Sequence, residues 1–371
     1  MTEWKEYKLG EIADVQTGPF GSQLHMSDYQ NEGTPIITVE HLGDNRIIHN
    51  NLPLVGDEDK NRLRKYVLSE GDIVFSRVGS VDRRAYVSAK EDGWMFSGRC
   101  LRVRPSQKAD AKFLSYYFGL EDFKETIRRI AVGATMPSIN TTILSNVVVP
   151  LPPIDTQRRI SAILSSLDDK IDLLHRENAT LEQMAETLFR QWFVVEAQEE
   201  WEDVLLGDLI DIGSGKGLQR SEFVENGLYS VLGANGEIGK TNKYLVDEGD
   251  RVIYTGRVGT LGNIFRLENK KAWLSDNTLV IKPKEYYNFV YFVLKLSRLQ
   301  DYNVGSTQPL IRQSDIKEIE LVLPDRGILN AFEKECDLIY EKVENNNKQI
   351  QTLIQTRDGL LPRLMGGEVK I

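Results

Sequence analysis

Two long segments of the chain place apolar residues alternately three and four positions apart. This spacing is typical of a coiled-coil seam, in which one face of a helix packs against a partner helix. We predict a helix of about 38 residues in each segment, long enough to need such a partner in water. The seam positions are Ile160, Leu164, Leu167, Ile171, Leu174, Asn178, Leu181, Ala185, Leu188 and Trp192 in the first segment, and Phe332, Cys336, Ile339, Val343, Asn346, Ile350, Leu353, Arg357, Leu360 and Leu364 in the second.

Each seam contains one asparagine. If the two helices pair antiparallel about a common centre, Asn178 comes to lie opposite Asn346. A facing pair of amides satisfies its own hydrogen bonds and disfavours other registers, at some cost in stability. We therefore predict that these two residues set the register of the helix pair. The alternative is that each asparagine lies on a solvated edge.

The remaining residues form two regions with a different pattern. Short β-prone runs alternate with Gly, Pro, Asn and Asp, and each region contains one helical stretch, at 110–130 and at 286–303. We predict a mixed α/β globule for each region. The expected strands include 34–42, 72–78, 99–105 and 146–152 in the first region, and RVIYT and NTLVIKP in the second.

The two halves of the chain repeat one another. Trp4 to Gly18 matches Trp201 to Gly215, Glu70 to Ser80 matches Glu248 to Thr260, and Gly133 to Pro152 matches Gly305 to Pro324. The repeat is too long for a solenoid unit and indicates two similar domains, each followed by a similar helix. We predict an α/β fold with a pseudo-two-fold repeat and two long antiparallel helices that form a coiled coil between the domains. The predicted boundaries are 1–153, 154–199, 200–325 and 326–371.

Charge narrows the possible partners. The chain has 46 Lys and Arg against 55 Asp and Glu, a net charge of −9. Because basic surfaces supply most non-specific affinity for DNA, this balance argues against strong DNA binding by the chain alone. Two corresponding stretches, 77–104 and 251–271, are nevertheless locally basic. We expect weak DNA binding unless a partner adds positive surface.

The chain carries no signal for a membrane or an oxidising compartment. No apolar run approaches the length of a transmembrane helix, and the first residues do not resemble a signal peptide. Cys100 and Cys336 lie far apart in unrelated contexts, which favours free thiols. We therefore predict a cytoplasmic protein with no membrane contact.

Motifs for catalysis are missing. The run GSGKG at 213–217 lacks the spacing of a phosphate-binding loop, so we interpret it as a tight turn. The histidines and cysteines show no metal-ligand spacing. Glu58 to Lys60 loosely resembles a nuclease arrangement but is interpreted as a hydrophilic loop. We expect no catalytic residue, no metal and no cofactor in this chain.

Several of these segments together resemble a known family. They are LGEI (Leu9–Ile12), EGDIVFSRVG (Glu70–Gly79), ATMPSIN (Ala134–Asn140), LPPI followed by Gln157, LDDKID (Leu167–Asp172), LFRQWF (Leu188–Phe193) and LLPRLMGGE (Leu360–Glu368). Each is short, but in this order, across the whole chain, they resemble the specificity subunit of type I restriction-modification enzymes (HsdS).

The resemblance implies a function. Each globule would be a target recognition domain that reads one half of a bipartite double-stranded DNA sequence, and the helices would set the gap between the halves. Two methyltransferase subunits, which bind S-adenosylmethionine, would dock on the helices and their ends. Restriction and translocation subunits, which use ATP and Mg²⁺, would join that core. The specificity subunit itself would be non-catalytic.

Candidate DNA-contacting residues follow from the repeat. Arg77 and Arg257 share an R-V-G turn in both copies, and we interpret them as phosphate contacts. Positions that differ between the copies are better candidates for reading base edges. These are Ser22, Gln23, Arg83, Arg84 and Asn140 in the first domain, and Lys216, Gln219, Arg220, Asn235, Asn263, Gln308 and Arg312 in the second.

Three aromatic residues, Phe189, Trp192 and Phe193, end the first helical segment. They form either a docking surface for a partner or a packing surface against Trp201 in the second domain. Two alternatives to a recognition subunit also stay open. One is an enzyme that modifies DNA by itself, and the other is a two-lobed coiled-coil adaptor that binds only proteins.

Overall fold

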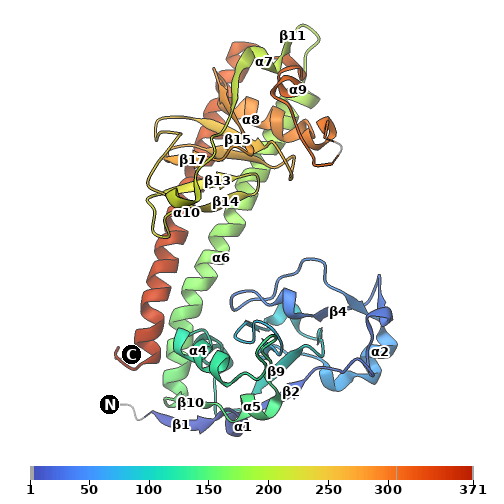
Figure 1. Cartoon of the computed structure of the whole chain (residues 1–371), viewed down its shortest axis with the longest axis vertical. Coiled ribbons are helices and arrows are strands. Elements are labelled where there is room, and N and C mark those ends of the chain that lie inside the picture. Colours follow the sequence, from blue (N-terminus) through green and yellow to red (C-terminus); the bar gives the residue numbers. More distant parts are fainter. Residues whose placement is uncertain (1–3, 306, 370–371) are drawn as a thin grey trace. The chain divides into compact units, whose positions relative to one another are not determined.

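The computed structural model describes residues 4–305 and 307–369, which form two compact units. Unit 1 combines Met1–Leu173 with Gln349–Ile371, and unit 2 is Leu174–Lys348. Each unit contains one globular part and one segment from each of two long helices, α6 (Ile154–Arg190) and α10 (Arg326–Met365) (Figure 1). The boundary between the units therefore lies within both helices.

An antiparallel four-stranded sheet organises the globular part of unit 1. Its strand order is β2 (Ala13–Thr17), β9 (Cys100–Pro105), β6 (Ile73–Ser76) and β7 (Arg84–Tyr86). All four residues of β6 are buried, which is expected of a strand with both faces covered. A second sheet has the order β3 (Tyr29–Gln30), β5 (Leu54–Val55), β4 (Thr34–Ile37) and β8 (Met95–Phe96), with β4 and β8 parallel.

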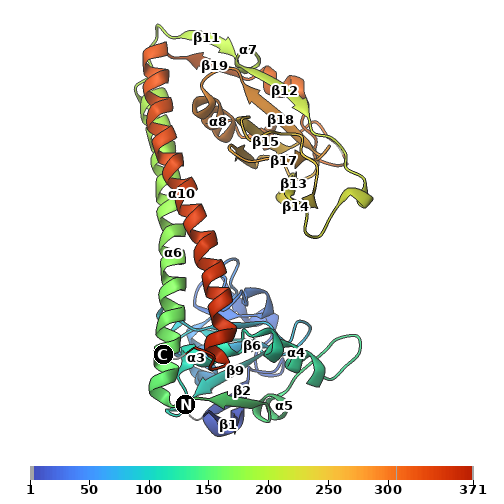
Figure 2. The same ribbon diagram turned by 90° about the vertical axis from the view of Figure 1, so that its left-hand side faces the viewer.

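Unit 2 repeats this plan. Its main sheet has the order β12 (Ile210–Ser214), β18 (Thr278–Pro283), β15 (Val252–Gly256) and β16 (Ile264–Leu267). A second sheet, β14 (Gly236–Thr241), β13 (Tyr229–Gly233) and β17 (Ala272–Leu274), again contains one parallel pair, β13 with β17. Helix α8 (Tyr287–Leu296) contributes to the core that includes the main sheet (Figure 2).

A two-stranded clasp closes each globular part next to its helices. In unit 1, β1 (Lys5–Lys8) pairs antiparallel with β10 (Val148–Leu151), just before α6. In unit 2, β11 (Glu202–Leu205) pairs with β19 (Glu320–Leu323), just before α10. Short helices follow the first strand and precede the second in both units, namely α1 (Leu9–Ile12) and α5 (Thr141–Ser145), and α7 (Leu206–Leu209) and α9 (Gln313–Lys317). The predicted mixed α/β fold with an internal repeat is confirmed.

Three local predictions differ from the structure. The stretch at 110–130 is two helices, α3 (Ala111–Tyr117) and α4 (Glu121–Ile130), and Gly119 between them leaves no space for a Cβ beside Arg84. The stretch at 286–303 ends as an α-helix at Leu296, before Arg298 adopts a φ of 48°. The predicted loop around Glu58 is a helix, α2 (Asp57–Arg62). The acidic residues in its first turn stabilise it by their interaction with the positive end of the helix dipole.

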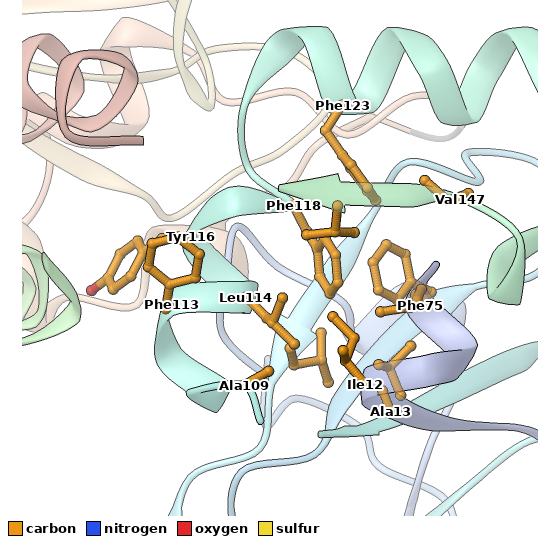
Figure 3. Close-up of a cluster of buried hydrophobic side chains, with 14 of the residues drawn as sticks. Ile12, Ala13, Phe75, Ala109, Phe113, Leu114, Tyr116, Phe118, Phe123 and Val147 are labelled. Carbon is orange, nitrogen blue, oxygen red and sulfur yellow. The ribbon is translucent and has the colours of Figure 1, made fainter. Parts of the chain in front are cut away.

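The core of each unit includes both helix segments. In unit 1, aromatic residues of β6, α3 and α4 pack around Ile12, as Figure 3 shows for Phe75, Phe113 and Phe123. The same cluster contains Ile160 and Leu164 of α6 and Leu364 and Met365 of α10. In unit 2 the cluster contains Ala185 and Phe189 of α6 and Leu329, Phe332 and Cys336 of α10. The two helices are therefore antiparallel, since the start of one shares a core with the end of the other.

The two seam asparagines meet in unit 2. Asn346 Nδ2 donates to Asn178 Oδ1 at 2.9 Å, and Asn178 Nδ2 donates to Asn347 Oδ1 at 2.9 Å. Asn346 is fully buried, and its Oδ1 makes no hydrogen bond within the described residues. The predicted contact is present, with Asn347 as an additional member. Its role in setting the register stays a prediction.

We expect the two asparagines to be strongly coupled in stability. Asn178→Leu alone should lower the free energy of unfolding by about 1–3 kcal/mol, because it leaves the buried Asn346 amide without a partner. Adding Asn346→Leu should recover that loss, because an apolar pair needs no hydrogen bond. A double-mutant cycle measured by urea unfolding tests this coupling. Additive losses in the two single variants would contradict it.

Candidate nucleic-acid interface

The R-V-G turns occupy the same place in both units. The turn Arg77–Gly79 follows β6, and Arg77 N donates to Arg99 O at 2.8 Å. The turn Arg257–Gly259 follows β15, and Arg257 N donates to Asn277 O at 2.8 Å. The two turns therefore leave equivalent strands and return to equivalent partners.

A second loop closes on each turn from the other side. In unit 1, Gly79 N donates to Pro137 O at 2.8 Å and Ile139 N donates to Arg77 O at 2.9 Å. In unit 2, Gly259 N donates to Pro309 O at 3.0 Å and Ile311 N donates to Arg257 O at 3.0 Å. The matched motifs of the sequence repeat are thus matched in backbone hydrogen bonding.

The glycine that ends each turn is required by its backbone conformation. Gly79 has a φ of 75° and Gly259 a φ of 86°, which side chains of L-residues rarely tolerate. A Cβ at either position would meet no atom within 4 Å. Both turns therefore present bare backbone to open space, where a large ligand can approach closely.

A third segment reaches each turn from the end of the first sheet strand. Gly18 N donates to Cys100 O at 3.2 Å, and Gly215 N donates to Thr278 O at 3.0 Å. A Cβ at Gly18 would lie 2.2 Å from Ser97 O, and one at Gly215 would lie 2.1 Å from Ser275 O. These glycines are needed for close backbone packing, which supports the interpretation of GSGKG as a turn. Together, residues 17–20, 77–80 and 134–139 in unit 1 and 214–217, 257–260 and 307–311 in unit 2 are called the turn clusters.

Arginine side chains of unit 1 differ sharply in their availability. Arg77 Nη1 donates to Gly98 O at 3.0 Å, and its guanidinium lies 5.4 Å from the ring centre of Phe20. Arg83 is half-buried and donates to the carbonyl of Leu42. Arg84 is only 5% exposed, and its Nε donates to Ser115 O at 3.1 Å. The prediction that Arg84 reads bases is therefore wrong, because this side chain is buried and its guanidinium donates to Ser115 O and to Asp44 Oδ1.

The other candidates of unit 1 lie at or next to the turn cluster. Asn140 is exposed and caps α5, with its Oδ1 accepting from Ile143 N at 2.8 Å. Ser22 is exposed, whereas Gln23 is half-buried and accepts a hydrogen bond from Tyr66 Oη at 2.8 Å. Among the described residues, the side-chain amide nitrogens of Asn140 and Gln23 and the Ser22 hydroxyl form no hydrogen bond, so they are available to a ligand.

In unit 2 the candidates include a chain of exposed polar groups. Asn263 Nδ2 donates to Asn235 Oδ1 at 3.2 Å, and Asn235 Nδ2 donates to Thr260 Oγ1 at 3.0 Å. Arg257 Nη1 donates to Ser214 Oγ at 3.4 Å. These contacts bring Asn235, Asn263 and Arg257 together at the turn cluster of unit 2, in a fixed orientation that suits hydrogen bonding to a ligand.

The remaining unit 2 candidates are exposed. Gln308 and Arg312 belong to or follow the loop that closes on the turn, and Arg312 Nε donates to Asp315 at 3.3 Å. Lys216 lies in the turn cluster, and its carbonyl accepts from Trp273 Nε1 at 2.8 Å. Gln219 and Arg220 lie two and three residues beyond it, at the start of a 3₁₀ turn. Whether each reads a base stays a prediction.

The aromatic residues at the end of α6 form part of the core of unit 2. Phe189 is 6% exposed, and its ring centre lies 5.5 Å from that of Phe292. Phe193 packs against Phe332 at 4.9 Å and against Trp201 at 6.3 Å, and Trp192 lies 6.0 Å from Phe332. These residues therefore form a packing surface, which is one of the two predicted alternatives. The prediction that Phe189 docks a partner is wrong because the Phe189 side chain is buried.

Polar contacts fix the globular part of unit 1 to its helix segments. Asp168 of α6 accepts from Tyr116 Oη at 2.5 Å and from Arg357 Nη1 of α10 at 2.7 Å. Burial and the bond to Asp168 raise the pKa of Tyr116. Asp172 of α6 pairs with Arg46 at 3.0 Å. The turn cluster of unit 1 therefore belongs to a body that is tied to the helices by charge.

The described residues provide neither a metal site nor a reactive thiol. No group of three His, Cys, Asp or Glu in that part of the chain has a geometry that could hold a metal ion. Burial raises the pKa of both Cys100 and Cys336 to about 12, so neither thiol is ionised at neutral pH. Within residues 4–305 and 307–369, no helix is long and apolar enough to cross a membrane.

Two units with one backbone plan, different side chains at equivalent turns and two shared helices define a class of paired recognition modules. The family model of the type I restriction modification DNA specificity domain matches residues 1–183 and 198–352. The chain belongs to this family, as its sequence motifs predict.

Known proteins similar to the chain agree with this assignment. The type I restriction enzyme MjaIX specificity subunit of Methanocaldococcus jannaschii is 24% identical over 419 residues, which cover 100% of this chain and 94% of the relative. The HindI specificity subunit of Haemophilus influenzae is 24% identical over 475 residues, covering 100% of both chains. The crystal structure of a type I restriction-modification S subunit from M. genitalium has a TM-score of 0.62 at 17% identity and covers 98% of this chain and 96% of that one. This last likeness concerns the fold.

Two residues of the turn cluster of unit 1, and Arg99 next to it, are not among the candidates predicted from the sequence. Phe20 and Met136 are exposed apolar residues, and Arg99 is an exposed cation whose carbonyl accepts from Arg77 N. A search for positions that change chemical type between aligned repeats would have found Phe20 and Met136.

Proposed function

We propose that this chain is the DNA-recognition subunit of a type I restriction-modification complex and that it reads a split DNA target, one half-site per unit. The observation that supports this most is the duplicated turn cluster. The same backbone hydrogen bonds hold different side chains in the two units. A shared frame with different side chains is suited to read different bases, so the two half-sites are expected to differ in sequence.

In this proposal other subunits carry the chemistry. Two methyltransferase subunits, which bind S-adenosylmethionine, would modify the target, and restriction subunits that use ATP and Mg²⁺ would move along and cut DNA. The chain itself would be non-catalytic. Its net charge of −9 supports a dependence on partners, because DNA affinity needs positive surface that this chain does not supply alone.

Mapping DNA methylation in cells with and without this chain tests the proposal. The expected result is a motif of two short halves separated by a fixed gap, present only when the chain is expressed with its methyltransferase subunit. Methylation of DNA by the purified chain alone would favour a stand-alone enzyme. The absence of a split motif, with no gain in DNA affinity when the methyltransferase subunit is added, would favour a protein adaptor.

Arg77 and Arg257 give a test of the phosphate contacts. We expect Arg77→Ala and Arg257→Ala to weaken the complex by similar factors on target and non-target DNA, because a phosphate contact carries no base information. Each substitution should also reduce the slope of log affinity against log salt by about 1. Dissociation constants measured at several salt concentrations check this. A loss confined to target DNA would show instead that the arginine reads a base.

A further inference from the structure

Equivalent positions of the two turn clusters carry different chemistry. Gly18 and Gly215 make matching hydrogen bonds, so Phe20, two residues after the first, corresponds to Gly217. Pro137 and Pro309 accept from the matching turn glycines, so Met136 corresponds to Gln308. Unit 1 therefore presents two apolar side chains at positions where unit 2 presents a bare backbone and an amide.

Phe20 is held in an exposed position. It is 54% exposed, yet its ring lies 5.4 Å from the guanidinium of Arg77. Arg77 is itself fixed by its hydrogen bond to Gly98 O at 3.0 Å. The ring is thus ordered by a cation–π contact on one face, while the rest of it faces solvent. Met136 is 66% exposed on the loop that closes on the same turn.

The Phe20 ring has a cationic neighbour. The Arg77 guanidinium stacks on the Phe20 ring. The backbone carbonyl of Arg99 accepts a hydrogen bond from Arg77 N at 2.8 Å. The Arg99 side chain is exposed and forms no ion pair within the part of the chain that the structure describes. An apolar side chain next to a cationic one fits a ligand that is itself apolar at one point and anionic beside it.

On the edges of DNA bases, the thymine C5-methyl group has this character. It is the apolar group that the major groove displays, and backbone phosphates lie on either side of it. We propose that Phe20, with Met136 beside the same turn, contacts a thymine methyl group in the half-site read by unit 1. This inference rests on the proposed function. Unit 2, with Gly217 and Gln308 instead, should read its half-site without such a contact.

Replacing thymine by deoxyuridine removes only the methyl group and so tests the contact directly. The complex of this chain with its methyltransferase subunit is titrated with DNA carrying the mapped target, in which each thymine is replaced in turn. We expect one position, in one half-site, to lose about fourfold in affinity, the factor expected from the burial of one methyl group. Phe20→Ala should lose a similar factor on unmodified DNA and should then be insensitive to deoxyuridine at that position.

Phe223→Ala is a matched control. Phe223 is also a partly exposed phenylalanine, 36% exposed, but it lies in unit 2 outside the turn cluster. The Phe223→Ala complex should keep the full deoxyuridine effect. Hydrogen exchange of β2 and β9 establishes that Phe20→Ala leaves the sheet of unit 1 folded, as its exposure predicts.

Several outcomes would overturn the inference. They are the absence of any thymine with a deoxyuridine effect, an effect that Phe20→Ala leaves unchanged, and equal coupling in both half-sites. A loss in Phe20→Ala that does not depend on the methyl group would indicate an intercalating wedge instead. In each of these cases the split target remains mapped, so the proposed function stands. If no split target exists, the proposed function itself fails.

Discussion

Phe332→Ala should lower the free energy of unfolding of unit 2 by about 3–5 kcal/mol, the range for removing a fully buried phenylalanine. Phe332 is 0% exposed, and four aromatic rings surround it. Phe189 belongs to α6, Trp192 and Phe193 belong to the π-helical segment Gln191–Val195 that follows it, and Phe292 belongs to α8. The Phe332 ring of α10 therefore packs against all three elements. Truncation leaves a cavity that these large, rigid side chains cannot fill without leaving their rotamers.

Hydrogen exchange of peptides from α8 measures this effect in unit 2 itself. The protection of 289–294 should fall by the same free energy if these amides exchange by unfolding of the whole unit. Phe223→Ala, at the surface of the same unit, is the control and should cost less than about 1 kcal/mol. A comparable loss in both variants would mean that the aromatic cluster is not the main support of unit 2.

Arg266→Ala should cost unit 2 about 1–3 kcal/mol, because it removes a partly buried, charged hydrogen bond and the contacts of a guanidinium with aromatic rings. Arg266 Nη2 contacts Glu268 Oε1 at 2.5 Å, and side-chain exposure is 12% for the arginine and 21% for the glutamate. Its guanidinium also lies 3.4 Å from the ring centre of Tyr340 of α10 and 4.9 Å from that of Tyr291 of α8. The side chain therefore connects strand β16 with both helices by charge and by cation–π contacts.

Two further variants separate these contributions. Arg266→Lys keeps the charge but loses the planar group that stacks on the rings. Its free energy of unfolding should therefore lie between those of Arg266→Ala and wild type. Arg251→Ala removes a cation that also contacts Glu268, but its side chain is 40% exposed, so we expect a loss of at most about 1 kcal/mol. Urea unfolding of all three variants provides the comparison. Equal stability of Arg266→Ala and wild type would show that the contacts of Arg266 contribute nothing to the stability of unit 2.

The helices and the repeat were predictable because both are periodic features of the sequence. The spacing of seam residues depends only on the geometry of a helix, and for an antiparallel pair with a common centre it places Asn178 opposite Asn346. The matched motifs of the two halves likewise required no knowledge of contacts. The predicted ends of helices were less accurate. Gly119 packs against Arg84, which is distant in sequence, and Arg298 has a positive φ, and the hydrophobic pattern shows neither feature.

Side-chain burial was the least predictable property. Arg83 and Arg84 are neighbours with the same side chain, yet only Arg84 is buried, since it begins β7, pairs with Phe75 of β6 and donates to Ser115 O. Phe189 looked available at a helix end but packs under residues that lie about 100 to 140 positions later in the chain. Such outcomes depend on pairings between distant segments, which no local window contains. Phe20 was missed for the opposite reason, since an exposed phenylalanine is unremarkable until its ordered contact with Arg77 is seen.

The two units also differ in when their parts become available during synthesis. Unit 2 is one continuous stretch, Leu174–Lys348, whereas unit 1 needs Gln349–Ile371 to complete it. Leu364 and Met365 belong to the core of unit 1 and are translated after all of unit 2. A released chain that ends near residue 350 should therefore contain a complete unit 2 and an incomplete unit 1, with the apolar positions Ile160 and Leu164 uncovered by α10. The domain made first is thus expected to finish folding last.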